Sequence, residues 1–273
     1  MKYDKTILIV DADGTLLTDE KGVLPVDKAA IAEFIENGGL FTVATGRGVA
    51  AARSVVETIG LDLLSLPLVV FNGAAIYDFK KEKFLWKCGL CGSAKEYVET
   101  LLQRFPVLGT EILVDDDVYV IRTNDFEEEH LAFAGIEPIR CDYSEVPKDG
   151  WIKVLLIDTP EAIDEVVAFC EESICEQTHI VRSSPMYYEI LPQNVNKWTG
   201  IEKLFELTEL SNRSSYRIIT AGDYMNDLEM IKNSDIGVAP MNAQEVVKDA
   251  ANMLVCDNNS GIIQDILEKL AVD

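Results

Sequence analysis

The amino-acid sequence predicts an α/β protein with a Rossmann-like, doubly wound parallel sheet as its core and a second, α+β domain inserted into it. Two observations carry this prediction. Toward both ends of the chain, short apolar runs alternate with amphipathic segments, which is the pattern of parallel strands joined by helices. In between, paired strands with tight acidic turns replace that alternation. We therefore expect a core domain of residues 1–81 and 189–273, and an inserted domain of residues 82–188.

The first predicted strands are short apolar runs that lead into polar residues. They lie at residues 7–10, 40–44 and 68–71. A first helix is expected to begin near Pro25 and to end at Gly38, and a second covers residues 49–59. Right-handed crossover connections would place the three strands side by side in one sheet.

The remaining elements follow from the same periodicities. The inserted domain is predicted to hold strands at residues 84–88, 111–114, 118–122, 151–157 and 186–191, and helices at 94–105 and 161–175. The core pattern then resumes with helices at residues 198–207, from about 225, at 243–250 and at 260–270, and strands at 216–221, 236–239 and 253–255. Because this last region restores the alternation of the first, we assign both to one sheet.

Composition limits the partners of the chain. Its 24 basic and 47 acidic residues give a formal net charge of −23, which repels nucleic acid and anionic membranes, so we expect neither as a partner. A phosphorylated small molecule would need a local cation to offset this charge. The acidic runs at residues 115–117 and 127–129 are expected to form solvated faces.

Cysteine usage and hydropathy indicate a cytoplasmic protein with reduced thiols. Cys88 and Cys91 have CxxC spacing, but no second pair with zinc spacing follows, so we favour free thiols over a redox or zinc site. No apolar run approaches the roughly 20 residues of a membrane span. The six cysteines are Cys88, Cys91, Cys141, Cys170, Cys175 and Cys256.

The first strand delivers two carboxylates, Asp11 and Asp13, to a turn at Gly14. Two like charges so close together favour a bound cation or a shared proton. The alternative is a solvated turn, since Asp and Gly are ordinary turn residues. An EF-hand loop is not expected, because the glycine falls too early for its spacing.

Ligands of an open α/β sheet bind beyond the carboxyl ends of its strands. This rule brings together Asp11, Asp13, Thr45, Asn72 and Asp223. A cluster of oxygen ligands with few histidines suits Mg²⁺.

The polar residues that follow the predicted strand at 216–221 allow two interpretations. Asp223 and Asp227 lie four residues apart around a helix start, so both can face one cation. Capping of that helix by Asp223 or Asn226 explains the same residues equally well.

Two further residues fit a phosphate group. Thr45 places a hydroxyl between a strand and a helix, where it could bind an anion, cap the helix, or do both. Lys197 supplies the positive charge that a phosphate needs in this acidic protein, although an isolated lysine is ordinarily a surface residue.

Together, these residues form four ordered motifs that resemble those of the haloacid dehalogenase superfamily of phosphatases. The motifs are Asp11-Ala12-Asp13-Gly14-Thr15, Thr45-Gly46-Arg47, Lys197, and Gly222-Asp223-Tyr224-Met225-Asn226-Asp227. The segment Asn72-Gly73-Ala74-Ala75-Ile76 and the large insertion further resemble the Cof-type subgroup. One departure is Trp198, because the subgroup usually has glycine after its lysine.

The resemblance implies a hydrolase that is Mg²⁺-dependent and acts on a small phosphomonoester. Asp11 would be the nucleophile and form an aspartyl-phosphate, and Asp13 would be the general acid and base. The resemblance assigns catalysis to Asp11, Asp13, Thr45 and Lys197, substrate binding to Thr45, Gly46, Arg47, Asn72 and Lys197, and the metal to Asp11, Asp13, Asp223, Asn226 and Asp227. For Asp13 the metal ligand would be its backbone carbonyl.

The inserted domain would then be a cap that excludes water and selects the leaving group. We expect a phosphatase of sugar phosphates or similar metabolites that is a monomer or a weak homodimer. The alternatives are a sugar phosphomutase on the same core and a non-catalytic metabolite-binding protein.

Overall fold

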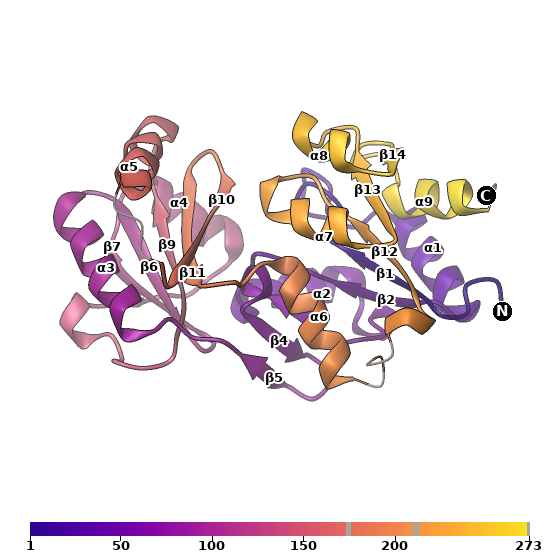
Figure 1. Ribbon diagram of the computed structural model, residues 1–273, viewed down its shortest axis with the longest axis horizontal. Helices are drawn as coiled ribbons and strands as arrows, with labels where there is room; N and C mark the ends of the chain where they lie inside the picture. The colour runs from indigo at the N-terminus through magenta and orange to yellow at the C-terminus, as the bar shows by residue number, and fades with distance from the viewer. Residues whose placement is uncertain (173–175, 209, 211–212, 272–273) are drawn as a thin grey trace. The chain divides into compact units, whose positions relative to one another are not determined.

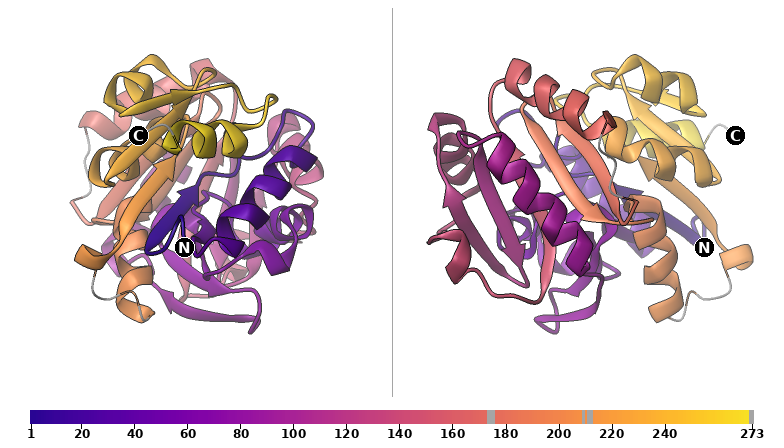
Figure 2. Two further views of the ribbon diagram at one scale, coloured as in Figure 1. Left: turned by 90° about the vertical axis from the view of Figure 1, so that its right-hand side faces the viewer. Right: turned by 60° about the vertical axis from the view of Figure 1, so that its left-hand side comes forward.

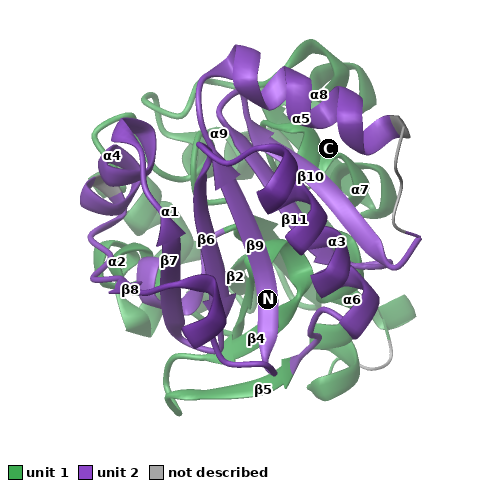
Figure 3. Ribbon diagram, turned by 90° about the vertical axis from the view of Figure 1, so that its left-hand side faces the viewer, with its two compact units in different colours: residues 1–46, 52–86, 196–273 green, residues 47–51, 87–195 purple. Residues whose placement is uncertain are grey.

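The computed structural model describes residues 1–172, 176–208, 210 and 213–271. The chain divides into two compact units (Figure 3). Unit 1 comprises Met1–Gly46, Ala52–Trp86 and Asn196–Asp273, and unit 2 comprises Arg47–Ala51 and Lys87–Val195. Each unit has its own sheet and its own hydrophobic core.

Unit 1 is built on a five-stranded parallel sheet, as the sequence predicted (Figure 1). Its order is β14 (Met253–Val255), β13 (Ile236–Pro240), β12 (Arg217–Ala221), β1 (Thr6–Val10) and β2 (Leu40–Val43). The central strand β1 is buried along its whole length and pairs with β12 on one side and β2 on the other. The carboxyl ends of β1 and β12 therefore lie side by side, although about two hundred residues separate them in sequence.

Helices cover both faces of this sheet (Figures 1 and 2). α1 (Pro25–Glu36) packs against α9 (Ile262–Leu270) on one face, and α6 (Lys197–Leu207) packs against α7 (Leu228–Asn233) on the other. The remaining two helices are α2 (Val49–Ile59) and α8 (Glu245–Ala250). None of the helices in the described part of the chain has the length and apolar character needed to cross a membrane.

The third predicted strand does not extend the parallel sheet. β3 (Leu68–Val70) forms an antiparallel sheet with β4 (Ala75–Asp78) and β5 (Lys83–Lys87), and one parallel bridge from Val69 to Ala44 joins it to the end of β2. The prediction missed β4, because its short apolar run follows directly on the turn at Asn72 and Gly73 with no intervening loop. The chain thus reverses direction immediately after β3 reaches the carboxyl edge of the core sheet, and it continues as the antiparallel strand β4.

Unit 2 is a six-stranded, mostly antiparallel sheet with two helices on one face (Figure 3). α3 (Gly92–Arg104) and α5 (Pro160–Glu172) pack there against apolar residues such as Ile112, Val154 and Ile190. The strand order is β10 (Thr178–Ser184), β11 (Tyr187–Pro192), β9 (Trp151–Ile157), β6 (Gly109–Val114), β7 (Asp117–Arg122) and β8 (Ile139–Arg140).

Unit 2 also contains elements that the sequence did not predict, among them β8, β10 and helix α4 (Asp125–Ala134). The acidic run at residues 127–129 was expected to be solvated, which is wrong for Glu127 because its side chain is buried. Asn124 caps α4 by accepting a hydrogen bond from the backbone N–H of Glu127, at 2.9 Å.

The cysteines in the described residues are free thiols. Cys91 is exposed, Cys88 is half-buried and Cys170 is buried. Cys175 lies outside the described residues, as does the end of the helix predicted for residues 161–175.

Candidate active site

The turn after β1 places Asp11 and Asp13 differently. Asp11 is buried, and its backbone N–H donates to the carbonyl of Ala221 at the end of β12, at 2.8 Å. The side chain of Asp13 is 40% exposed and pairs with the ammonium of Lys21 at 2.8 Å. The chain thus separates two carboxylates that are neighbours in sequence into a buried one and an accessible one.

Gly14 is required for this turn. Its φ of +74° lies in the left-handed region, and a Cβ at this position would lie 2.5 Å from Oδ2 of Asp223. The absence of a side chain at Gly14 therefore allows the β1 turn to approach the Asp223 carboxylate. Thr15 fixes that carboxylate, because its hydroxyl donates to Oδ1 of Asp223 at 2.9 Å.

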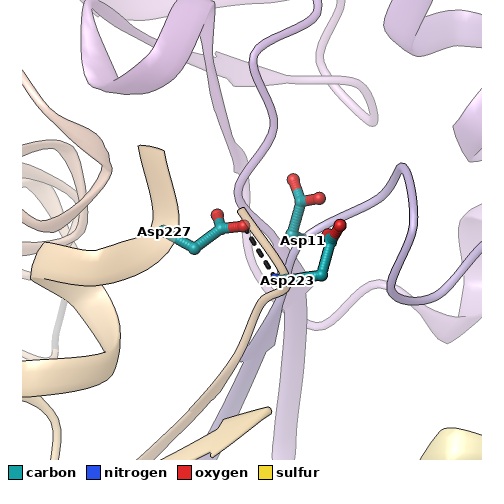
Figure 4. A group of neighbouring side chains, drawn as sticks. All are labelled: Asp11, Asp223 and Asp227. Carbon is teal, nitrogen blue, oxygen red and sulfur yellow. Dashed lines mark hydrogen bonds between the residues drawn. The ribbon is translucent and has the colours of Figure 1, made fainter. Parts of the chain in front are cut away.

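Asp223 follows β12 and Asp227 ends the short 3₁₀ helix η5 (Met225–Asp227). Oδ2 of Asp227 accepts a hydrogen bond from the backbone N–H of Asp223 at 3.0 Å (Figure 4) and one from the backbone N–H of Tyr224 at 3.1 Å. Asp227 therefore makes the capping contacts of this turn, which the sequence assigned to Asp223 or Asn226.

Three carboxylates converge where β1 and β12 end (Figure 4). One oxygen from each of Asp11, Asp223 and Asp227 lies within 4.8 Å of the other two. Hard oxygen donors in this arrangement fit a divalent cation such as Mg²⁺. The predicted metal ligands Asp11, Asp223 and Asp227 are thus brought together. The side chain of Asp13 pairs with Lys21, and the side-chain amide of Asn226 donates to Asn72.

Lys197 is the counter-charge of this cluster. It occupies the first turn of α6, is fully buried, and its Nζ lies 2.5 Å from Oδ1 of Asp11 and 2.5 Å from Oδ1 of Asp227. The interpretation of Lys197 as a surface lysine is therefore wrong. The adjacent Trp198 packs into the hydrophobic core of unit 1.

The pKa values reflect crowded charges in a buried site. Burial, together with the carboxylates of Asp227 and Asp223, raises the pKa of Asp11 well above its usual range, although Lys197 opposes the shift. Burial and Asp227 raise the pKa of Asp223 to about 7. Burial alone would lower the pKa of Lys197, but Asp11 and Asp227 raise it above its usual range. A divalent cation among the three carboxylates would relieve their repulsion.

Thr45 and Asn72 lie where β2 and β3 end, and both are buried. The backbone N–H of Thr45 donates to the carbonyl of Val69 at 2.9 Å, and the carbonyl of Thr45 accepts from the N–H of Asn72 at 3.0 Å. Thr45 does not cap α2, which begins only at Val49. A Cβ on Gly46 would lie 3.0 Å from the side-chain amide of Asn72, so the two loops are in close contact.

The turn of Phe71, Asn72 and Gly73 has an unusual backbone. All three residues have positive φ values, of 53°, 53° and 101°. Side chains larger than glycine seldom adopt this region, and such strain concentrates at functional sites. Oδ1 of Asn72 accepts a hydrogen bond from the side-chain amide of Asn226 at 3.0 Å, which ties the turn to the loop after β12.

The same turn touches helix α6 backbone to backbone. A Cβ on Gly73 would lie 2.0 Å from the carbonyl oxygen of Asn196, and one on Gly200 would lie 2.6 Å from Cα of Gly73. This contact fixes the first turn of α6, which carries Lys197. Sequence reasoning missed Thr15 and Gly200; a glycine inside a helix is costly, which was the available signal for Gly200.

Arg47 is part of unit 2, where its guanidinium donates to the carbonyl of Ala51 at 3.3 Å. Arg47 therefore belongs to a different unit from the other predicted site residues, which are in unit 1.

The fold and the site define the class of protein: an α/β enzyme with a carboxylate cluster at the carboxyl edge of a parallel sheet. A family model for haloacid dehalogenase-like hydrolases matches residues 8–267. The chain therefore belongs to the haloacid dehalogenase-like hydrolases, as the motifs predicted.

Individual relatives match over nearly their whole length. The chain is 24% identical over 259 residues to the 5-amino-6-(5-phospho-D-ribitylamino)uracil phosphatase YcsE of Bacillus subtilis, covering 93% of this chain and 91% of that one. It is 24% identical over 279 residues to the pyridoxal phosphate phosphatase YbhA of Escherichia coli, covering 96% and 97%. The structure of the subclass IIB sugar phosphatase BT4131 matches with a TM-score of 0.84 at 19% identity, covering 98% and 100%.

Proposed function

We propose that this protein is a Mg²⁺-dependent phosphatase that hydrolyses a small phosphorylated metabolite through an aspartyl-phosphate on Asp11. The observation that carries the proposal is the position of Asp11, which is buried between a lysine ammonium and two further carboxylates. The relatives named for sugar and pyridoxal phosphatase activities support a phosphomonoester of metabolite size.

In the first step, a carboxylate oxygen of Asp11 attacks phosphorus. The bond from phosphorus to the alcohol oxygen breaks, its electron pair stays on that oxygen, and Asp13 supplies the proton. In the second step, Asp13 takes a proton from water as the water attacks phosphorus and releases Asp11. The exposure of Asp13 suits this role because it must exchange protons with substrate and solvent.

The acidic group fits a metal ion, and we propose Asp11, Asp223, Asp227 and the backbone carbonyl of Asp13 as its ligands. A divalent cation bound there would neutralise charge on the transferring phosphoryl group. Asn226 donates to Asn72, so we assign it a supporting role.

Phosphate binding is assigned to Lys197, Thr45 and Gly46. Lys197 provides a buried ammonium, and Thr45 provides a hydroxyl that its backbone contacts hold in place. We further propose Asn72 and Arg47 as substrate-binding residues, and unit 2 as the cap domain that selects the alcohol.

The deciding experiment compares Asp11→Asn with the wild type on a panel of phosphate esters with Mg²⁺. We expect kcat to fall by at least about a thousandfold, because the amide keeps the shape but loses the nucleophile. Asp62→Asn, at an exposed position on the surface, serves as the matched control and should keep wild-type turnover.

Two alternatives have distinct outcomes. A phosphomutase would return the phosphoryl group to the sugar without release of inorganic phosphate, and a binding protein would be stabilised by one ester without turning it over. Undiminished phosphate release by Asp11→Asn would remove Asp11 as nucleophile. Activity that persists after exhaustive treatment with EDTA would remove the metal from the mechanism.

A further inference from the structure

Two asparagines of unit 1 contact the turn that carries Asp13. Asn242 lies just beyond the end of β13, and Asn258 lies just beyond the end of β14. Both strands run parallel to β12 in the core sheet, so both asparagines are at the carboxyl edge where β1 and β12 present Asp11 and Asp223. The sequence assigned neither asparagine to the site.

The side chain of Asn242 connects the turn after β1 to the loop after β14. Its Nδ2 donates a hydrogen bond to the carbonyl of Gly14 at 2.7 Å, and its Oδ1 accepts one from the backbone N–H of Asn258 at 3.1 Å. Both ends of the amide have partners, which fixes its orientation, with the nitrogen toward Gly14. A carboxylate of the same shape could make only the second contact, because it has no proton to donate.

Asn258 holds the far end of the same turn. Its side chain is buried, and its Nδ2 donates to the carbonyl of Leu17 and to Oδ1 of Asp19, each at 3.0 Å. The segment of residues 14–19 is therefore attached near both of its ends to the loops that follow β13 and β14.

The loop after β13 also contacts the turn after β12. The backbone N–H of Gln244 donates to the backbone carbonyl of Asp223 at 2.9 Å. Residues 242–244 thus bind Gly14 through a side chain and Asp223 through the backbone, and they fix these two neighbours relative to each other.

The turn needs such support because its own contacts constrain Asp13 weakly. Glycine has more backbone freedom than any other residue type, and Gly14 directly follows Asp13. The side chain of Asp13 is 40% exposed, and an ion pair at this exposure, such as the one with Lys21, contributes little to its placement. Placement matters, because a displacement of about 1 Å at a reacting group can cost about a hundredfold in rate.

We propose that Asn242 is a positioning residue for Asp13: its amide holds the carbonyl of Gly14 and thereby keeps the general acid in reach of the leaving oxygen. This inference rests on the proposed function, in which Asp13 protonates the departing alcohol. Asn242 acts through the backbone of the turn rather than on the substrate. Loss of its contact should therefore weaken protonation of the alcohol and leave attack by Asp11 largely unchanged.

Two phosphate esters separate these effects. Benzyl phosphate releases a strongly basic alkoxide that must be protonated as it leaves, whereas p-nitrophenyl phosphate releases a stabilised phenolate that needs no proton. In Asn242→Ala we expect kcat/KM to fall at least about tenfold for benzyl phosphate and to stay within about threefold of the wild type for p-nitrophenyl phosphate. The parameter kcat/KM covers the steps up to departure of the alcohol, so the later hydrolysis of the aspartyl-phosphate does not enter it.

Two further variants sharpen the comparison. Asn242→Asp keeps the acceptor for Asn258 but cannot donate to Gly14, so it should show the same selective loss as Asn242→Ala. Asn233→Ala removes an exposed asparagine at the end of α7 and is the matched control, with both kcat/KM values unchanged. Because the side chain of Asn242 is exposed, its replacement leaves no buried cavity and the variants should fold.

Hydrogen exchange followed by NMR gives a readout that needs no turnover. The backbone N–H groups of Leu16 and Leu17 donate within the turn to the carbonyls of Asp11 and Ala12, at 3.2 and 2.8 Å. In Asn242→Ala these two amides should exchange at least about tenfold faster than in the wild type, while the amides of β12 keep their wild-type rates. A general loss of stability would instead speed exchange in both places.

Three outcomes would overturn the inference. They are wild-type kcat/KM values for both esters in Asn242→Ala, losses of equal size for the two esters, and wild-type exchange at Leu16 and Leu17. Lack of phosphate release from every ester by the wild-type protein would instead contradict the proposed function. The exchange rates would still decide whether Asn242 holds the turn that carries Asp13.

Discussion

At the scale of single residues, the site depends on one position that cannot carry a side chain. Gly14 combines a left-handed φ with a carboxylate 2.5 Å from where its Cβ would lie. We predict that Gly14→Ala lowers kcat at least about a hundredfold, because the new methyl group must displace Asp223 or the turn that carries Asp13. Steady-state kinetics with saturating Mg²⁺ measure the effect.

Gly60→Ala is the matched control for backbone strain. Gly60 has φ +103°, but no atom lies within 4 Å of where its Cβ would be. This variant should lose roughly 1 kcal/mol of unfolding free energy and keep its kcat. Equal kcat values for the two alanine variants would show that the contact between Gly14 and Asp223 is unimportant for catalysis.

Residue types and spacing predicted much of the site. Asp11, Asp223 and Asp227 follow strand ends, and the rule for open α/β sheets was sufficient to bring Asp11 and Asp223 together. The same reasoning could not predict that Glu111 and Glu127 are buried. Burial of a lone glutamate depends on which face of a strand or helix meets a neighbour, and that is decided by tertiary packing rather than by local sequence.

At the scale of elements, helix α9 receives its cap from a distant helix. Asp27 of α1 is buried, and its Oδ1 accepts from the backbone N–H groups of Ile263 and Gln264, at 2.8 and 3.3 Å. Gly261, the residue before α9, provides no side-chain cap. The first turn of α9 therefore depends on a side chain that lies more than 230 residues earlier in the chain.

The Asp27 cap should make stability depend on pH in a defined direction. Burial raises the pKa of Asp27, although the helix N–H groups oppose the shift. The folded state then binds this proton more tightly than the unfolded state, so the contribution of Asp27 to stability is greatest below pH 3.8 and is lost as pH rises through the folded pKa. Asp27→Asn, which keeps the acceptor without the charge, should gain stability relative to the wild type between pH 3.5 and 7.

Urea unfolding of both proteins across this pH range measures the difference. Asp27→Ala removes the acceptor and should lose about 1–2 kcal/mol of unfolding free energy at low pH, and this loss should shrink as pH rises. We expect the unfolding free energy of Asp27→Asn, relative to that of the wild type, to increase as pH rises. If this difference stayed constant or fell as pH rises, the raised pKa of Asp27 would be contradicted.

Elements were predicted best where one periodicity extends over the whole segment. The strand at residues 151–157 and the strand at residues 253–255 were predicted with the bounds that the structure has. Helix α4 was not predicted, because its many acidic residues obscure the apolar periodicity around Leu131. Strand β4 was not predicted, because a turn with positive φ values joins it directly to β3.

At the scale of the whole molecule, the two units differ in how their strands are distributed along the chain. All six strands of the unit 2 sheet come from residues 109–192, whereas the unit 1 sheet pairs β1 with β12. We predict that a chain ending at residue 216 retains protected amides in β9 but not in β1, because β9 keeps both neighbours and β1 loses one.

Hydrogen exchange on this truncated chain and on the full chain measures the effect strand by strand. Equal loss of protection in β1 and β9 would show that the unit 2 sheet does not form without the completed sheet of unit 1.

The pairing of β1 with β12 also sets an order of events at the ribosome. β1, the strand that leads into Asp11, is synthesised about 200 residues before its neighbour β12, which corresponds to roughly 10–40 s of translation. During that interval the nascent chain exposes one edge of an apolar strand, while every strand of the unit 2 sheet already has its partners. We therefore expect the chain to be most prone to aggregation in the interval before β12 emerges.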